Sequence, residues 1–132
     1  MADSFPFELV SPERLLVSAQ VESVVIPGSE GEMTVMAHHA PLMTTLRPGV
    51  IRVRHAGGQE ERYLAFGGFA DITPEGCTIL AESALPAAQF TRDDLSARIE
   101  TARTEIANAP DDHSRTRLEE FLRDLSHLED AV

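Results

Sequence analysis

The sequence predicts a mainly β plus α fold class, with an N-terminal antiparallel β-sandwich followed by a C-terminal two-helix antiparallel hairpin. From Phe5 to about Ala84, short apolar runs recur with Gly, Pro or Ser between them, at the spacing of about 8 to 12 residues typical of sandwiches. After Pro86 the apolar residues recur at helical spacing instead. We therefore expect a sandwich domain at residues 1–86 and a helical hairpin at residues 87–132.

Alternation within the short runs predicts which faces are buried. Ile51 and Val53 fall on one face of a strand and Arg52 and Arg54 on the other. Cys77, Ile79 and Ala81 likewise share one face, so we expect the cysteine to be a small core residue. Between these runs, Gly67-Gly68 is expected to let two strands pass closely or bend.

Two helices are predicted beyond Pro86. Thr91 and Asp94 have the types and spacing of a helix start, where the hydroxyl can accept a backbone N–H and a carboxylate in the first turn is favoured by the helix dipole. The segment 108–112 contains Pro110 and ends the first helix. Apolar stripes include Ala102, Phe121 and Leu128, and the residues expected to pack the hairpin are Leu95, Ile99, Ile106, Leu118, Leu122 and Leu125. The burial of these few large apolar side chains cannot offset the conformational entropy lost when both helices become ordered. The hairpin must therefore pack on the sandwich or on a partner.

Composition excludes several classes of protein. The 132 residues carry a formal net charge of −11, which argues against a nucleic-acid partner. All eleven cationic residues are Arg. The single cysteine allows no internal disulfide and fits a reducing compartment. No apolar run approaches the ~20 residues of a membrane span. The first residues do not show the basic segment and following apolar block of a secretory signal, so none is expected. We expect no direct membrane insertion.

No pattern of reactive residues indicates catalysis. Adjacent His38 and His39 would project to opposite faces of a strand, and His55, His113 and His127 lie in separate elements without metal-ligand spacing. There is no nucleophile elbow, and Gly67-Gly68 is not a phosphate loop, because the chain has no lysine to complete one. The sequence predicts no catalytic residue, no metal site and no cofactor.

The segment Pro27 to Glu32 predicts a rigid acidic turn at the end of a strand, with Gly28 and Gly31 free to adopt positive φ. With its neighbours it forms an ordered series of motifs, which are SPER at 11–14, PGSEGEM at 27–33, HHAPL at 38–42, RPG at 47–49, GGFADI at 67–72 and TILAESA at 78–84. This series resembles the epsilon subunit of the bacterial F-type ATP synthase over about the first 90 residues.

The resemblance implies a non-catalytic rotor subunit that joins the gamma subunit to the c-ring and so couples ring rotation to ATP synthesis. It implies peripheral attachment to the cytoplasmic face of the bacterial inner membrane, through the complex. It implies that the acidic turn meets the c-ring and that the following segment belongs to the surface that packs against gamma and the ring. The residues carried over are Glu30, Gly31, Glu32, His39, Ala40, Pro41 and Leu42.

The sequence departs from the family pattern in places. The family commonly has Gly at the position of His38 and often has Gly at the position of Thr34. We therefore expect a different turn geometry there. Some members bind ATP through Asp-x-x-Arg-Ala, but Arg98 lies one residue too far from Asp94, so no nucleotide site is expected. The hairpin is implied to reach catalytic-head subunits. In its second helix, acidic residues outnumber the basic ones, Arg115, Arg117 and Arg123, so weak or no inhibition is expected.

Two alternatives stay open. A free-standing β-sandwich regulatory or binding module would dock a partner helix through its hairpin and would not copurify with gamma. A small jelly-roll metalloenzyme would require two or three histidines converging from neighbouring strands, and the histidine spacing disfavours it.

Overall fold

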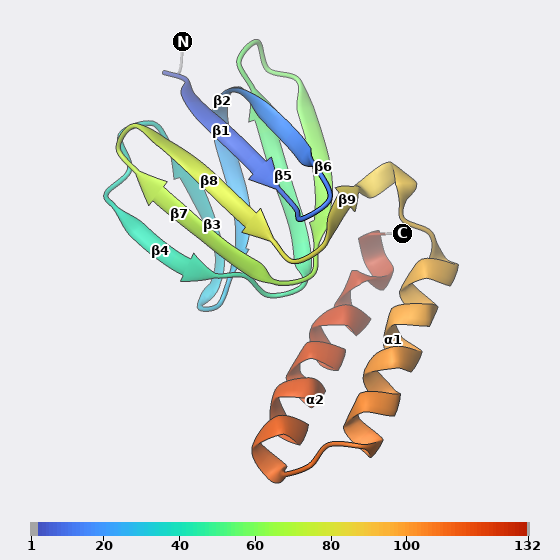
Figure 1. Cartoon of the computed structure of the whole chain (residues 1–132). Coiled ribbons are helices and arrows are strands. Elements are labelled where there is room, and N and C mark those ends of the chain that lie inside the picture. The colour runs from blue at the N-terminus through green and yellow to red at the C-terminus, as the bar shows by residue number, and fades with distance from the viewer. Residues whose placement is uncertain (1–2, 132) are drawn as a thin grey trace.

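The computed structural model describes residues 3–131, and it confirms the predicted sandwich and hairpin (Figure 1). The strands are β1 (Phe5–Val10), β2 (Leu15–Gly28), β3 (Gly31–Met36), β4 (Leu42–Thr45), β5 (Gly49–His55), β6 (Glu60–Ala65), β7 (Gly68–Thr73), β8 (Gly76–Ala81) and β9 (Ala84–Pro86). The helices are α1 (Arg92–Ala107) and α2 (Asp112–Ser126), with short 3₁₀ helices η1 (Ala87–Gln89) and η2 (His127–Ala131). In the described part of the chain, neither helix has the length and apolar character needed to span a membrane.

The long strand β2 connects the two layers of the sandwich. The strand order is β4-β7-β8-β1-β2-β5-β6-β9, and β3 pairs with β2. The first part of β2 pairs with β1, from Leu15 to Val21, and its last part pairs with β3, from Ser23 to Gly28. β1 and β8 pair in parallel, whereas the neighbouring pairs are antiparallel.

The predicted alternation places the core correctly. Ile51, Val53 and Ile79 are fully buried inside the sandwich, and Cys77 lies among them. Arg52 and Arg54 are exposed on the opposite face of β5. Gly68 has φ +120, and a Cβ there would lie 2.8 Å from the Ala81 Cα, so the expected close passage of two strands is confirmed.

The helix boundaries follow from side chains that cap them. The Thr91 hydroxyl accepts the Asp94 N–H at 3.1 Å, and the Asp94 carboxylate accepts the Thr91 N–H at 3.0 Å, which forms a capping box. Asn108 ends α1, and the Asp111 carboxylate accepts the Ser114 N–H at 2.7 Å to begin α2. The start and the interruption predicted from the sequence are therefore confirmed.

The hairpin packs on one end of the sandwich through a second, smaller apolar cluster (Figure 1). The sandwich contributes buried Leu64 and Phe66, and the C-terminal segment contributes Phe90, Leu95, Ala102, Leu125 and Leu128. Ile99, Phe121 and Leu122 are partly buried against this cluster. Ile106 and Leu118 are half-buried and lie outside it. The expectation that the hairpin packs on another part of the protein is confirmed.

Candidate interaction surface

The acidic turn is a tight hairpin at the tip of β2 and β3. Gly28 and Gly31 are the last pair of the ladder, so Ser29 and Glu30 form the exposed tip. Gly31 has φ +126, as expected for a glycine whose conformation other residues rarely adopt. Gly28, in contrast, is buried and is not among the positive-φ glycines, so the expectation for it was wrong. A Cβ there would lie 3.1 Å from the Gly31 carbonyl oxygen, so Gly28 provides space instead.

Hydrogen bonds from neighbouring strands hold this turn in place. The Ser29 N–H donates to the Thr45 carbonyl at 3.0 Å, and Leu46 forms a bridge with Gly28. Glu32 accepts a hydrogen bond from Arg52 Nη2 at 3.1 Å, so its carboxylate is already paired on β5. Glu30 remains at the tip as the exposed acid, and the backbone beneath it is held at several points.

The structure brings Leu42, but not the residues before it, to the acidic turn. A groove of about 480 Å³ separates the turn from β4, and its lining includes Glu30, Gly31, Glu32, Leu42 and Met43. His39, Ala40 and Pro41 lie in the loop between β3 and β4, at the other end of β3 from the turn. β3 is 6 residues long, so at about 3.4 Å per residue roughly 20 Å separates the turn from the start of this loop, whereas Pro41 ends the loop directly before Leu42.

His38 lies in a turn after β3 rather than in a strand. Its φ is +66, so this residue adopts the left-handed backbone conformation that glycine favours. The sequence predicts a different turn geometry where His38 stands in place of glycine. The backbone observed at this position is left-handed. The imidazole Nε2 lies 3.2 Å from an Asp3 carboxylate oxygen.

An exposed apolar strip runs from this groove across the outer face of the sheet. We define the strip by Met43, Phe69 and Leu80, whose exposed fractions are 65%, 39% and 43%. Met43 and Phe69 line one shallow depression, and Phe69 and Leu80 line the next, beside Pro12. Because these depressions share residues with the groove at the turn, the three form a continuous surface.

Sequence reasoning missed this strip, although a signal was present. Phe69 shares a face of β7 with Asp71, and Leu80 shares a face of β8 with Thr78. A large apolar residue on the polar face of a strand indicates a contact surface when several such residues adjoin. Met43 lies beside Asp71 in the same way.

Two ionisable side chains of the sandwich, Cys77 and Tyr63, have raised pKa values. Burial raises the pKa of the Cys77 thiol to about 12, so it stays protonated. Burial, together with a hydrogen bond to Glu61, raises the pKa of Tyr63 to about 12. Within the residues that the structure describes, no cluster of His, Cys, Asp or Glu is placed to hold a metal ion.

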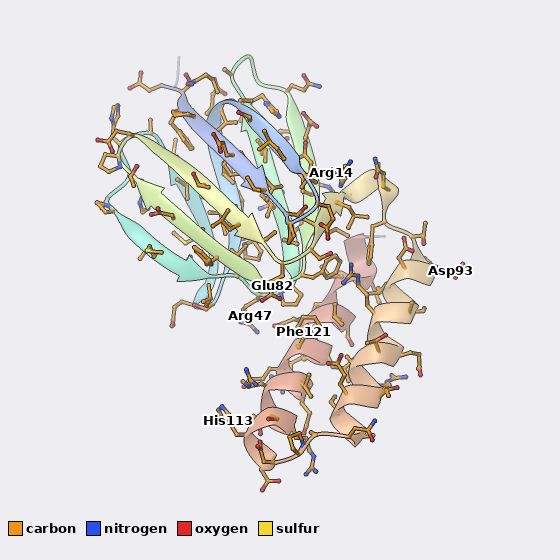
Figure 2. The ribbon with its side chains drawn as sticks, in the orientation of Figure 1. Arg14, Arg47, Glu82, Asp93, His113 and Phe121 are labelled. Carbon is orange, nitrogen blue, oxygen red and sulfur yellow. The ribbon has the colours of Figure 1, made fainter. Side chains whose placement is uncertain are left out.

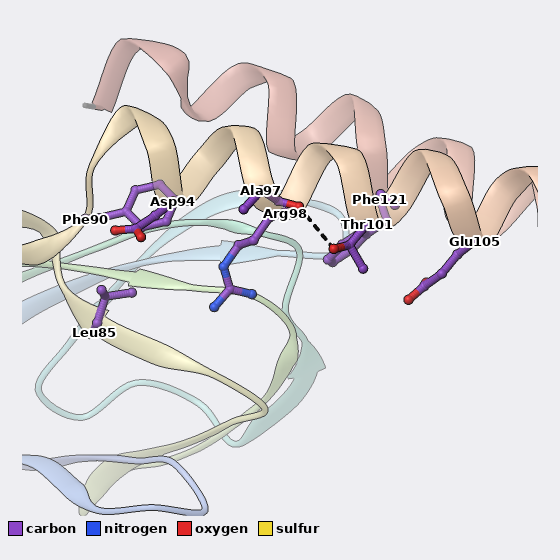
Figure 3. Close-up of a pocket in the computed structure, with 9 residues that line it drawn as sticks. Leu85, Phe90, Asp94, Ala97, Arg98, Thr101, Glu105 and Phe121 are labelled. Atoms are coloured by element: carbon purple, nitrogen blue, oxygen red, sulfur yellow. Dashed lines mark hydrogen bonds between the residues drawn. The ribbon is translucent and has the colours of Figure 1, made fainter.

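Arg98, the arginine that stands one residue out of place for the family's ATP-binding motif, contacts the sandwich. A pocket of about 600 Å³ lies beside α1, and Asp94, Arg98 and Phe121 are among the residues that line it (Figure 3). The Arg98 guanidinium lies 3.7 Å from the Phe66 ring centroid and donates to the Ser83 hydroxyl at 3.1 Å. Burial lowers the pKa of Arg98. Its guanidinium is engaged in holding α1 to the sandwich.

Comparison with known proteins identifies the family. The family described as "ATP synthase, Delta/Epsilon chain, beta-sandwich domain" matches residues 4–87. The chain belongs to the ATP synthase delta/epsilon family. Its similarity to family members extends beyond the sandwich. The ATP synthase epsilon chain of Mesorhizobium japonicum is 63% identical over 132 residues, covering 100% of this chain and 98% of the relative. That of Rhizobium rhizogenes is 57% identical with the same coverage.

Two solved structures contain chains with the same arrangement. A chain in the cryo-EM structure of the Euglena gracilis mitochondrial ATP synthase, which contains OSCP, F1 and the c-ring, aligns with a TM-score of 0.77. The alignment has 27% sequence identity and covers 99% of this chain and 82% of that chain. A chain from the Tetrahymena thermophila mitochondrial ATP synthase central stalk and c-ring shares the fold with a TM-score of 0.57 at 12% identity. The delta/epsilon fold is therefore present over both the sandwich and the hairpin.

Proposed function

We propose that this protein is the epsilon subunit of a proton-translocating F-type ATP synthase, a rotor subunit of the central stalk that couples c-ring rotation through gamma to the catalytic head. The observation that carries the proposal is the continuity between the rigid acidic turn and the apolar strip. A subunit that transmits rotation needs two fixed contact surfaces on one stiff body. It is a non-catalytic subunit without a cofactor, attached to the cytoplasmic face of the bacterial inner membrane through the complex.

The two surfaces suit different partners. Glu30, Gly31 and Glu32 form a small, polar, well-supported tip, which suits the polar loops of a c-ring. The apolar strip suits gamma, because exposed Met and Phe side chains are typical of protein interfaces. Leu42 lies where the two surfaces meet, and His39, Ala40 and Pro41 extend the gamma contact to the far end of β3.

The chain divides by function at Pro86. Residues 1–86 make the gamma and c-ring contacts, and residues 87–132 form a hairpin that can reach catalytic-head subunits. Two exposed arginines of the hairpin, Arg103 and Arg115, already have acidic partners one helical turn away, Glu100 and Asp112. Because these two arginines are paired within their own helices and acidic residues outnumber basic ones on the second helix, we infer weak or no inhibition of ATP hydrolysis by the hairpin.

A pull-down of the tagged full-length chain from detergent-solubilised membranes tests this function. We expect gamma and the c-ring subunit to copurify and to be identified by mass spectrometry. Recovery of the chain without gamma, from membranes that contain an assembled ATP synthase, would support a free-standing binding module instead.

A further inference from the structure

Asp124 is a buried carboxylate on α2, where it faces the sandwich. Its side chain is 10% exposed, and its two oxygens accept hydrogen bonds from Arg47, at 3.1 Å from Nε and 2.8 Å from Nη2. This two-pronged geometry is the strong form of an arginine–carboxylate contact. A buried carboxylate without such a partner is strongly unfavourable, so the position of α2 depends on Arg47.

Arg47 is held on the sandwich side by its own backbone. Its N–H donates to the Pro27 carbonyl at 2.9 Å, and Leu46 forms a bridge with Gly28. Gly49 packs so tightly on Pro27 that a Cβ there would lie 2.6 Å from the Pro27 Cβ. Figure 2 shows Arg47 where the sandwich meets the helices. The guanidinium is therefore presented from a rigid segment, whereas its partner moves with the hairpin.

The rest of the contact between hairpin and sandwich is apolar. The sandwich strands contribute buried Leu64 and partly buried Val50 and Leu85, and Phe66 follows directly after β6. Arg98 restrains α1 by stacking on Phe66, and Arg47 restrains α2. Beside this apolar contact, the pair joins a half-exposed guanidinium to a carboxylate that is only 10% exposed, so the docking of α2 is sensitive to whether that carboxylate keeps its partner.

We propose that the Arg47–Asp124 pair is a latch that fixes the hairpin against the sandwich at the base of the acidic turn. When the guanidinium is removed, the Asp124 carboxylate must reach water, and it does so when α2 leaves the sandwich. Arg47 is thus a positioning residue for the hairpin. The latch goes beyond the proposed function, because it concerns the conformations of this chain alone.

Electron paramagnetic resonance distances in the full-length chain test the latch. Spin labels are attached to cysteines introduced at Gln59, in the loop between β5 and β6, and at Glu119 on α2, both of which are exposed. The native Cys77 is buried and does not react. We expect one narrow distance distribution in the parent, and a rise of about tenfold or more in the undocked population in Arg47→Gln.

A double variant separates the effect of the charge from a loss of packing. In Arg47→Gln with Asp124→Asn, no unpaired carboxylate remains, so we expect the docked population to recover partly relative to Arg47→Gln alone. Arg52→Gln is the matched control. It breaks the Arg52–Glu32 pair in the same groove, whose side chains are 47% and 65% exposed, and should leave the distribution narrow.

Three results would overturn the proposal. One is a distribution in Arg47→Gln as narrow as that of the parent. Another is a double variant as undocked as Arg47→Gln alone. The third is equal broadening in Arg52→Gln, which would show that the groove as a whole, rather than this pair, holds the hairpin.

Discussion

Phe69 and Leu80 lie opposite each other on β7 and β8, and both side chains stand on the outer face of the sheet. Val10 continues the same row on β1, since it pairs with Leu80. Two large apolar side chains in direct cross-strand contact, with the next strand extending the row, form a surface that favours a protein partner over water.

A charge on this row should weaken the gamma contact. We expect Phe69→Glu to lower the affinity for purified gamma by at least about tenfold, because it places a charge within the apolar strip. The melting temperature should change little, because Phe69 is an exposed residue. Gln59→Glu is the control, since Gln59 is exposed in the loop between β5 and β6 and lies outside both proposed contact surfaces. Equal loss in both variants, measured by calorimetry, would argue against the strip.

The backbone of the acidic turn should matter more than its charges. Proline fixes φ near about −65°, so Gly31→Pro cannot adopt the observed +126° and distorts the tip. We expect loss of ATP-driven proton pumping in inverted membranes while ATP hydrolysis is retained. Glu30→Gln should pump nearly normally, because an exposed carboxylate contact contributes only about 0 to 1 kcal/mol. Normal pumping by an assembled Gly31→Pro complex would remove the turn from the mechanism.

The sandwich should fold without the hairpin. Its main core and the cluster under the hairpin are separate sets of side chains, so a chain that ends at Phe90 keeps the main core intact. We expect a strand-rich circular dichroism spectrum, a lower melting temperature because Leu64 and Phe66 become exposed, and retained binding to gamma. An unfolded spectrum would contradict the proposed division at Pro86.

Acid should unwind the hairpin through its helix caps. The Thr91 N–H holds the pKa of Asp94 below its usual 3.8, and the Ser114 N–H does the same for Asp111. A carboxylate whose pKa is lower in the folded state contributes its full stabilisation above the unfolded pKa of 3.8. This contribution is lost as the pH falls through the pKa of the folded state. We expect the helical dichroism of the parent to fall at acid pH, and less so in Asp94→Asn with Asp111→Asn, whose amides do not titrate there.

ATP should not stabilise the protein measurably. The arginine nearest the family motif, Arg98, is engaged with Phe66 and Ser83. We expect millimolar ATP to leave the melting temperature nearly unchanged, as followed by dichroism. A shift of several degrees that disappears in Arg98→Gln would show that the pocket beside α1 binds nucleotide after all.

Local patterns predicted local structure well. Alternation placed Ile51 and Val53 in the core, and the spacing of Thr91 and Asp94 predicted a helix start, which the structure completes as a capping box. These signals succeed because they depend on neighbours within a few residues. The positive φ of Gly31 was predicted for the same reason, because the turn is only two residues long.

Long-range pairings were beyond the sequence. Arg47 and Asp124 are 77 residues apart, and neither has a local pattern that distinguishes it from an exposed charge. Asp124 therefore counted among the surface acids of the second helix until the structure showed it buried. The pairing of Glu32 with Arg52 depends likewise on strand register, which no alternation within one strand determines.

The burial of Cys77 makes this chain well suited to site-specific labelling. The thiol is inside the sandwich core, and burial raises its pKa to about 12, so reagents that need a thiolate do not reach it. With no lysine in the sequence, amine reagents have only the N-terminus to modify. A cysteine placed at any exposed position can thus carry a dye or a probe alone, without first mutating the native protein.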